Sequence, residues 1–287
     1  MDARSRIVAS RGFTMVELLT AIAVIAVLLG ILVPVLGQVR AAGHEAREMS
    51  AARQLMLAWT SYAVDSRDAV LPGKRSGLTA RDNFGVRMAG EAAARYPWRI
   101  APYLDYNLRG LYINEHVRVL AELEQGEEAD LGIERSYLMS LSPSLGINGT
   151  FIGGNEHPEE HGFDPGFLAA FGTFYVTHAA QIRRASDLLV FASARGQDPL
   201  VSGEGPAEGY FMVTPPRLTA IDGERWTATF DASNPPADYG YLSPRYADAA
   251  VVGFADGHAA RLTTNELRDM RHWANQARRE DFALVPR

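Results

Sequence analysis

The chain has 287 residues, of which 47% are hydrophobic and 22% are charged, and its formal net charge is -6. This length and composition are ordinary for a folded protein with one large domain or two small ones. The basic residues do not cluster, so the chain lacks the electrostatic footprint of a nucleic-acid-binding protein. Cysteine is absent, which excludes disulfides, thiolate metal sites and cysteine nucleophiles.

The first distinctive feature is an apolar run of residues without a charge, 18–37. As a helix rising about 1.5 Å per residue, it would be about 30 Å long, which matches the hydrocarbon core of a bilayer. Three arginines precede it against one aspartate, and such a flank favours a cytoplasmic N-terminus with the rest of the chain outside the cytoplasm. A cleaved secretory signal or a plain single-pass anchor are alternatives. However, the run is longer than the apolar core of an ordinary signal, and Glu17 stands at its start.

The letters GFTMVELL at 12–19 explain that glutamate. They resemble the processing site of type IV pilins and type II secretion pseudopilins: a short basic leader ending in glycine, then phenylalanine, then glutamate four residues on, then an apolar helix. The resemblance covers about the first 40 residues. It implies cleavage between Gly12 and Phe13 by a prepilin peptidase, followed by N-methylation of Phe13. It also implies that Glu17 of one subunit pairs with the free amine of Phe13 in the next, which agrees with the cost of a lone carboxylate near hydrocarbon.

A weak point is predicted inside the apolar helix. Pro34 removes a helical hydrogen bond, and its ring crowds the carbonyl of Gly30, itself a weak helix former. Residues 30–34 are therefore predicted to be where the helix bends, and the resemblance to pilins suggests the same position.

An amphipathic helix is expected to continue to about residue 66. Apolar residues recur every three or four positions, while the charged residues of 40–53, Glu48 included, are placed on other faces. The apolar stripe is interpreted as a face packed on a sheet. The predicted organisation is a leader at 1–12, a transmembrane helix at 13–37, the amphipathic continuation at 38–66 and an extracytoplasmic head at 67–287.

The head is predicted to be α+β, so that the long helix packs on a small antiparallel sheet as in pilins. Short helices are expected at 96–104 and 118–125, and strands at 188–195, 210–213, 226–230 and 249–255. The strongest local signal is a hairpin at 249–263 that turns at Asp256 and Gly257, a pair that tolerates positive φ. A capping box from Thr263 to Glu266 then predicts a short C-terminal helix.

This hairpin is a second point of resemblance. Pilin-like proteins abundant in planctomycete and verrucomicrobial genomes often carry a histidine, nine residues and then Asp-Gly near the C-terminus. Here Tyr246 occupies the position of that histidine. The hairpin is therefore similar to that of the group, whereas a processing role attached to the full motif is not implied for this chain.

One loop contains residue types that could bind a metal. His157 and His161 lie among acidic residues in NEHPEEHGFD, but Pro158 and Gly162 oppose the helix that a zinc-peptidase motif needs. Three aspartates beside a Pro-rich loop could supply oxygen ligands to calcium: Asp231, Asp238 and Asp248. A polar loop and no cofactor are the preferred interpretation of both.

The sequence thus favours a prepilin-type structural subunit rather than an enzyme. Its expected partners are the prepilin peptidase, other pilin or pseudopilin subunits and the lipid of the inner membrane, and it would assemble into a type IV pilus-like or type II secretion fibre. The alternative is a membrane-anchored module whose head binds a glycan or protein through the aromatic loops near Trp226, Tyr239 and Tyr241.

Overall fold

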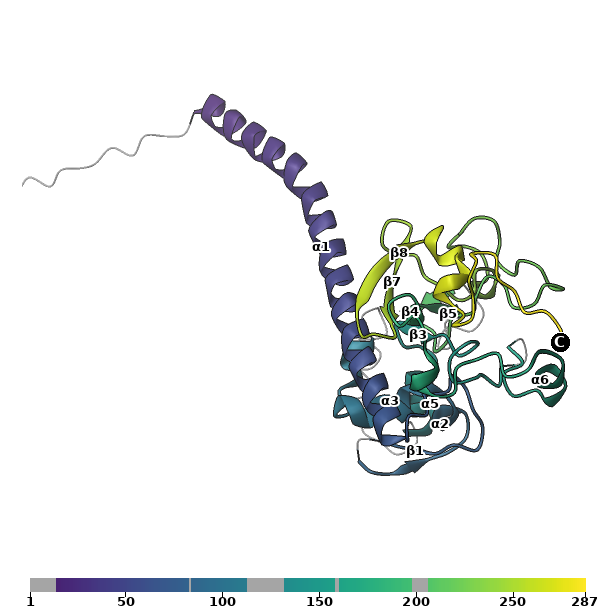
Figure 1. Cartoon of the computed structure of the whole chain (residues 1–287). Helices are drawn as coiled ribbons and strands as arrows, with labels where there is room; N and C mark the ends of the chain where they lie inside the picture. The colour runs from purple at the N-terminus through teal and green to yellow at the C-terminus, as the bar shows by residue number, and fades with distance from the viewer. Residues whose placement is uncertain (1–13, 83, 113–131, 158–159, 198–205) are drawn as a thin grey trace, which may run out of the picture. The chain divides into compact units, whose positions relative to one another are not determined.

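The computed structural model describes residues 14–82, 84–112, 132–157, 160–197 and 206–287. The chain divides into two compact units, 1–44 and 45–287. One helix, α1 (Met15–Asp65), contributes residues to both units (Figure 1).

The described part of the first unit is the N-terminal portion of α1. This portion is rich in Leu, Ala, Val and Ile. The helix is continuous through both Gly30 and Pro34. The large apolar side chains from Met15 to Val33 are all exposed within this unit. Nothing within the unit therefore buries this surface.

The second unit begins with the C-terminal portion of α1, which packs on the head. Ala52, Leu55, Met56 and Trp59 are buried, as the helical spacing of the apolar stripe predicts. The approach to the sheet is close, because a Cβ added to Gly253 would lie 3.0 Å from the Met56 Cγ. This portion of the helix therefore packs as part of the second compact unit, which begins at residue 45.

The central sheet of the head is antiparallel and has four strands in the order β3-β4-β7-β8. These strands are β3 (Leu145–Ile147), β4 (Leu189–Ser193), β7 (Ala249–Phe254) and β8 (Ala259–Thr263). Two small ribbons accompany it: β1 (Ala80–Arg81) pairs with β2 (Arg87–Met88), and β5 (Arg195–Gln197) pairs with β6 (Pro206–Glu208).

Side chains of β7 alternate between two hydrophobic clusters. Val251 belongs to the cluster that includes α1, whereas Ala250 and Val252 belong to a second cluster built around Trp226 and Trp273. Such alternation follows from the two-residue period of a strand. The sheet therefore has α1 on one face and the C-terminal segment on the other.

Short helices and turns complete the head. The α-helices are α2 (Glu91–Ala94), α3 (Tyr96–Ile100), α5 (Gly132–Leu141) and α6 (Pro165–Phe171). The 3-10 turns are η1 (Ala101–Leu104), η2 (Leu108–Leu111), η3 (Ala179–Gln181), η4 (Pro236–Tyr239), η5 (Glu266–Arg268) and η6 (Met270–His272). The combination of a long helix with small antiparallel sheets confirms the predicted α+β, pilin-like class.

Several predicted elements agree with the structure. The hairpin is formed by β7 and β8, and Gly257 at its turn has φ 95°. The helix predicted at 96–104 is present as α3 and η1, and the strand predicted at 188–195 is present as β4. The helix predicted at 118–125 lies outside the described residues.

Other predictions were wrong for local reasons. Residues 210–213 and 226–230 form no strand: Met212 makes a single bridge to Ile147, and Trp226 is committed to the core instead. The C-terminal helix is replaced by η5 and η6, because the extended Asp269 interrupts it and caps the second turn. The predicted Thr263–Glu266 capping contacts are nevertheless present.

Candidate assembly site and the polar anchor of the long helix

The N-terminus of α1 is closed by reciprocal contacts between Thr14 and Glu17. The backbone N–H and the hydroxyl of Thr14 donate to the Glu17 Oε2 at 2.9 and 2.8 Å. In return, the Glu17 N–H donates to the Thr14 Oγ1 at 3.2 Å. This is a capping box, which satisfies donors that the first turn of a helix leaves unpaired. The carboxylate is therefore held beside the residues just after the predicted cleavage point.

The surface that follows Glu17 is suited to hydrocarbon. Among the described residues, Met15–Val33 form the one helical stretch that is long and apolar enough to cross a membrane, with mean hydropathy 2.8. Its large apolar side chains are exposed, and none of the described residues of its own unit buries them. A carboxylate thus stands at one end of a bare apolar helix.

The structure says less about the other N-terminal residues for which a role was predicted. Gly12 and Phe13 lie outside the described residues, so cleavage and methylation stay predictions. A Cβ added to Gly30 would meet no atom within 4 Å in the described chain, and the Pro34 side chain is outside the description. A bend at this glycine–proline pair therefore also stays a prediction.

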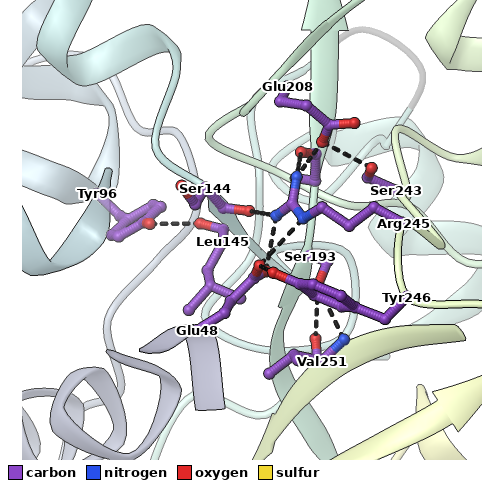
Figure 2. Close-up of polar contacts among 11 residues, drawn as sticks. Glu48, Tyr96, Ser144, Leu145, Ser193, Glu208, Ser243, Arg245, Tyr246 and Val251 are labelled. Carbon is purple, nitrogen blue, oxygen red and sulfur yellow. Dashed lines mark hydrogen bonds and ion pairs between the residues drawn. The ribbon is translucent and has the colours of Figure 1, made fainter. Parts of the chain in front are cut away.

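A second glutamate of α1, Glu48, lies in a wholly different environment (Figure 2). Only 1% of its surface is exposed, whereas the helical pattern placed it away from the packed face, and this expectation was wrong. Arg245 donates to both carboxylate oxygens, from Nη2 at 2.7 Å and from Nε at 3.0 Å. The Ser193 hydroxyl adds a third bond at 2.6 Å, and the Tyr246 hydroxyl adds a fourth.

Further contacts hold Arg245 in place. Its Nη2 donates to the Ser144 carbonyl at 2.9 Å, and its Nη1 forms an ion pair with Glu208. Glu208 in turn accepts the Ser243 hydroxyl at 2.7 Å (Figure 2). We name the group Glu48, Ser193, Glu208, Arg245 and Tyr246 the polar anchor. It joins α1 to strand β4, ribbon strand β6 and the segment before β7.

The electrostatics of the polar anchor explain why a charge is tolerated there. Burial opposes the Arg245 charge, but Glu48 and Glu208 outweigh it and raise the pKa of the guanidinium. Burial raises the pKa of Tyr246, and the Glu48 charge raises it further, so its hydroxyl stays protonated and donates. The buried Glu48 carboxylate therefore has a bidentate arginine and two hydroxyl groups as donors, and these hydrogen bonds compensate for its loss of hydration.

Tyr246 thus has a structural task at the position where related hairpins carry histidine. Its hydroxyl contacts the long helix, and its backbone exchanges hydrogen bonds with Ala249 at the start of β7. Sequence reasoning found this position through the hairpin but did not find its partner. Residues 48, 52, 56 and 59 share one helical stripe, but this spacing alone does not indicate a partner for Glu48.

The His157–His161 loop has packing roles in the structure. His161 stacks on Phe167 with ring centroids 4.7 Å apart, and its Nδ1 lies 3.7 Å from the Asp164 Oδ2. Glu160 is fully buried and forms an ion pair with Arg225 at 3.1 Å. Among the described residues, no three His, Asp or Glu side chains gather as a metal ligand set.

The aspartates that were considered as calcium ligands accept hydrogen bonds in separate parts of the head. The Asp231 Oδ1 accepts the Ser233 N–H at 2.8 Å, and the Asp248 Oδ2 accepts the Thr264 hydroxyl at 2.8 Å. At the hairpin turn, the Asp256 Oδ1 accepts the His258 N–H at 3.1 Å. These carboxylates stabilise turns, and the structure does not bring them together.

Comparison with known protein families agrees with the geometry of the N-terminus. Residues 8–33 match a family described as the prokaryotic N-terminal methylation motif. The matched range ends at the last residue of the membrane-length stretch, and it includes Gly12, Phe13 and Glu17. Comparison with curated proteins found no match, and neither did comparison with solved structures.

The N-terminal segment is therefore a prepilin-type cleavage and methylation domain. Together with the apolar helix that follows, it fits a single-pass, membrane-anchored protein.

Proposed function

We propose that this protein is a structural subunit of a type IV pilus-like or type II secretion fibre. In this proposal the prepilin peptidase cuts between Gly12 and Phe13 on the cytoplasmic side of the inner membrane, and Phe13 is then methylated. The head lies outside the cytoplasm, and the work of the protein is assembly rather than catalysis.

The observation that carries the proposal is the pairing of a bare apolar helix with a carboxylate at its end. The helix from Met15 to Val33 exposes apolar side chains on all sides. Such a helix is stable in lipid, and it can leave lipid only by burial against other apolar helices, for which copies of itself are suitable partners. A fibre whose core is made of these helices provides that burial.

Glu17 would set the register of that assembly. Cleavage creates a positive amine on Phe13, and methylation preserves its charge. A carboxylate at the edge of hydrocarbon is most stable with a charged partner, and the amine of a neighbouring subunit supplies one. The capping box with Thr14 keeps the Glu17 carboxylate hydrogen-bonded before that partner arrives.

The alternative of a binding module gains no support from the aromatic loops that suggested it. Trp226 and Tyr239 are 5% and 2% exposed, and their rings pack against each other with centroids 4.7 Å apart. Tyr241 is half-buried and stacks on Tyr210 at 4.5 Å. These rings contribute to the packing of the head.

The proposal is tested first by the mass and N-terminal sequence of the mature protein from its native membrane. We expect a chain that starts at Phe13 and carries one added methyl group. A chain that starts at Gln38 would indicate an ordinary signal peptide, and an intact Met1 would indicate a plain anchor. Either result contradicts the proposal.

The second test separates processing from assembly. Glu17→Ala should leave cleavage largely intact and reduce incorporation into fibres by an order of magnitude or more, because the intersubunit pair is lost. Glu45→Ala, on the same helix in the head unit, is the matched control. Normal fibre incorporation of Glu17→Ala would exclude the pairing. Correct cleavage of the parent protein without any fibre would favour the anchored binding module.

A further inference from the structure

The head contains a hollow whose charge is of one sign. Its volume is about 420 Å³, which is in the range of small-ligand pockets. The side chains that matter here come from α1, the β1–β2 ribbon, α3 and the segment after η1; they are Tyr62, Arg81, Arg87, Trp98, Arg99 and Tyr106. Three of them are arginines, and none of the described residues that line the hollow is acidic. The site is distinct from both the N-terminal segment and the polar anchor.

Arg81 and Arg87 lie opposite each other in the ribbon, and the Arg81 Nη1 donates to the Gly85 carbonyl in the turn at 2.8 Å. They are paired in the register of the antiparallel strands β1 and β2, and both are exposed. Like charges directly opposite each other destabilise a two-stranded ribbon. The nearest carboxylate along the chain, Asp82, is occupied in the turn, where its Oδ1 accepts the N–H groups of Phe84 and Val86 at 2.9 and 2.8 Å.

Arg99 adds a third charge that is also without a carboxylate. It is 7% exposed, and its Nη2 donates to the carbonyls of Pro72 and Gly73 at 2.7 and 2.5 Å. Its Nη1 forms no hydrogen bond of proper geometry, although the Tyr62 hydroxyl interacts electrostatically with the guanidinium. Burial lowers the pKa of Arg99 to about 10, and the Arg75 charge acts in the same direction.

No acidic side chain in the described part of the chain forms an ion pair with any of these three arginines. Elsewhere in the head, arginines do pair: Arg245, Arg225, Arg217 and Arg268 each contact a glutamate. The hollow is therefore a local excess of positive charge in a protein whose net charge is -6. Arginine is the residue best suited to bind planar or tetrahedral oxyanions.

We propose that this hollow binds a small organic anion. Arg81 and Arg87 would hold its carboxylate, sulfate or phosphate group between them, with Arg99 contributing charge from beneath the exposed pair. The ring or carbon chain of the ligand would lie against Tyr62, Trp98 and Tyr106, since aromatic side chains bind apolar and sugar rings by packing. The anion would relieve the repulsion across the β1–β2 ribbon, so binding should stabilise this part of the head.

The test uses the full chain in detergent micelles and calorimetric titration at constant ionic strength, with chloride as the background anion. The probes are sulfate, glucuronate and uncharged glucose. We expect sulfate and glucuronate to bind, glucose not to bind, and glucuronate to bind more tightly because its ring also contacts the aromatic residues. Failure of both anions to bind in excess of chloride would overturn the proposal.

Variants locate the binding. Arg81→Gln and Arg87→Gln should each weaken glucuronate binding about tenfold, as expected for the loss of a charge-assisted hydrogen bond. Arg278→Gln, an exposed arginine that does not line the hollow, is the matched control. Equal affinity in all three variants would place the anion elsewhere and overturn the proposal.

Arg87→Glu provides a readout that does not depend on the ligand. It replaces the like-charged pair by an opposite pair, so the variant without ligand should melt at a higher temperature than the parent, and sulfate should no longer raise its melting temperature. A variant that still gains stability from sulfate as the parent does would contradict the site.

Discussion

Glu17 and Glu48 belong to the same helix, yet their surroundings differ in almost every respect. Glu17 is exposed, and among the described residues its carboxylate is hydrogen-bonded by Thr14 of its own first turn. Glu48 is buried, and its partners come from segments that are up to 198 residues away along the chain. Of these two carboxylates, Glu48 has its partners within the head, whereas Glu17 is exposed. The charge that stabilises the head is enclosed, whereas the charge that we propose for assembly stays at the surface.

Among the substitutions that test this difference between Glu17 and Glu48, Arg245→Met should have the largest effect on stability. It leaves the Glu48 carboxylate buried without its bidentate partner, and loss of one member of such a pair costs about 3–5 kcal/mol of unfolding free energy. Denaturant unfolding of the full chain in micelles measures this through its tryptophans, all four of which lie in the head unit. The control is the double variant Glu48→Met/Arg245→Met, which should recover most of the loss. Equal destabilisation of both variants would mean that packing, and not charge, dominates at this position.

Tyr246 gives a finer test of the polar anchor. Tyr246→Phe keeps the ring but removes the donor to Glu48, so we expect a loss of about 1–3 kcal/mol. Tyr246→His restores a donor at the position where related hairpins carry histidine, and it should lose less than the phenylalanine variant near neutral pH. The same unfolding assay distinguishes them. If histidine is as destabilising as phenylalanine, the contact with Glu48 is not what this position supplies.

Alkaline pH should weaken the polar anchor without affecting Glu17. Because the pKa of Tyr246 is raised in the folded protein, its hydroxyl keeps its proton after the unfolded chain loses it near pH 10. The contribution of Tyr246 is therefore constant below pH 10 and decreases as pH rises above it. Between pH 10 and 11, the parent should lose about 1 kcal/mol more stability than Tyr246→Phe. Parallel pH profiles of the two proteins would contradict the assignment.

Thr14→Ala should have the smallest effect, because it removes a cap and leaves Glu17 in place. Loss of a capping side chain costs about 1 kcal/mol, and this cost falls on the first turn of α1. Hydrogen exchange in micelles should show faster exchange at Glu17 and Leu18 and no change in the head. Thr14→Ser, which preserves the hydroxyl, is the control. Faster exchange in the head would show that the two regions are coupled.

The sequence was most informative where one local pattern determines the structure. Three predictions depended only on residues that are adjacent in sequence. They were based on the twenty residues without a charge, on the motif around Gly12 and on the Asp256–Gly257 turn. The corresponding predictions of a membrane-length helix, a prepilin-type motif and a hairpin agree with the structure and the family match. The α+β class followed from the same features.

The polar anchor could not be predicted in this way, because its stability depends on partners distant in sequence. A glutamate on a helix is normally placed on the solvent side, and only the presence of Arg245 reverses this preference for Glu48. Strand β3 was missed for a related reason: its residues LGI lie among Gly and Pro, and they pair as a strand only because β4 lies beside them. Trp226 is an example of the opposite error. Tryptophan is common in strands and a strand was predicted here, but Trp226 lies in a loop and its side chain is buried.

The distance along the chain between Glu48 and Arg245 also has a consequence for synthesis. The two residues are separated by 197 positions, so the ribosome produces the helix long before it produces the arginine. Until residue 245 has been synthesised, burial of Glu48 would leave an uncompensated charge. Docking of the helix must therefore come late, after nearly the whole polypeptide has been delivered, and a prematurely terminated chain would keep its helix undocked and be recognisable to quality-control proteases as incomplete.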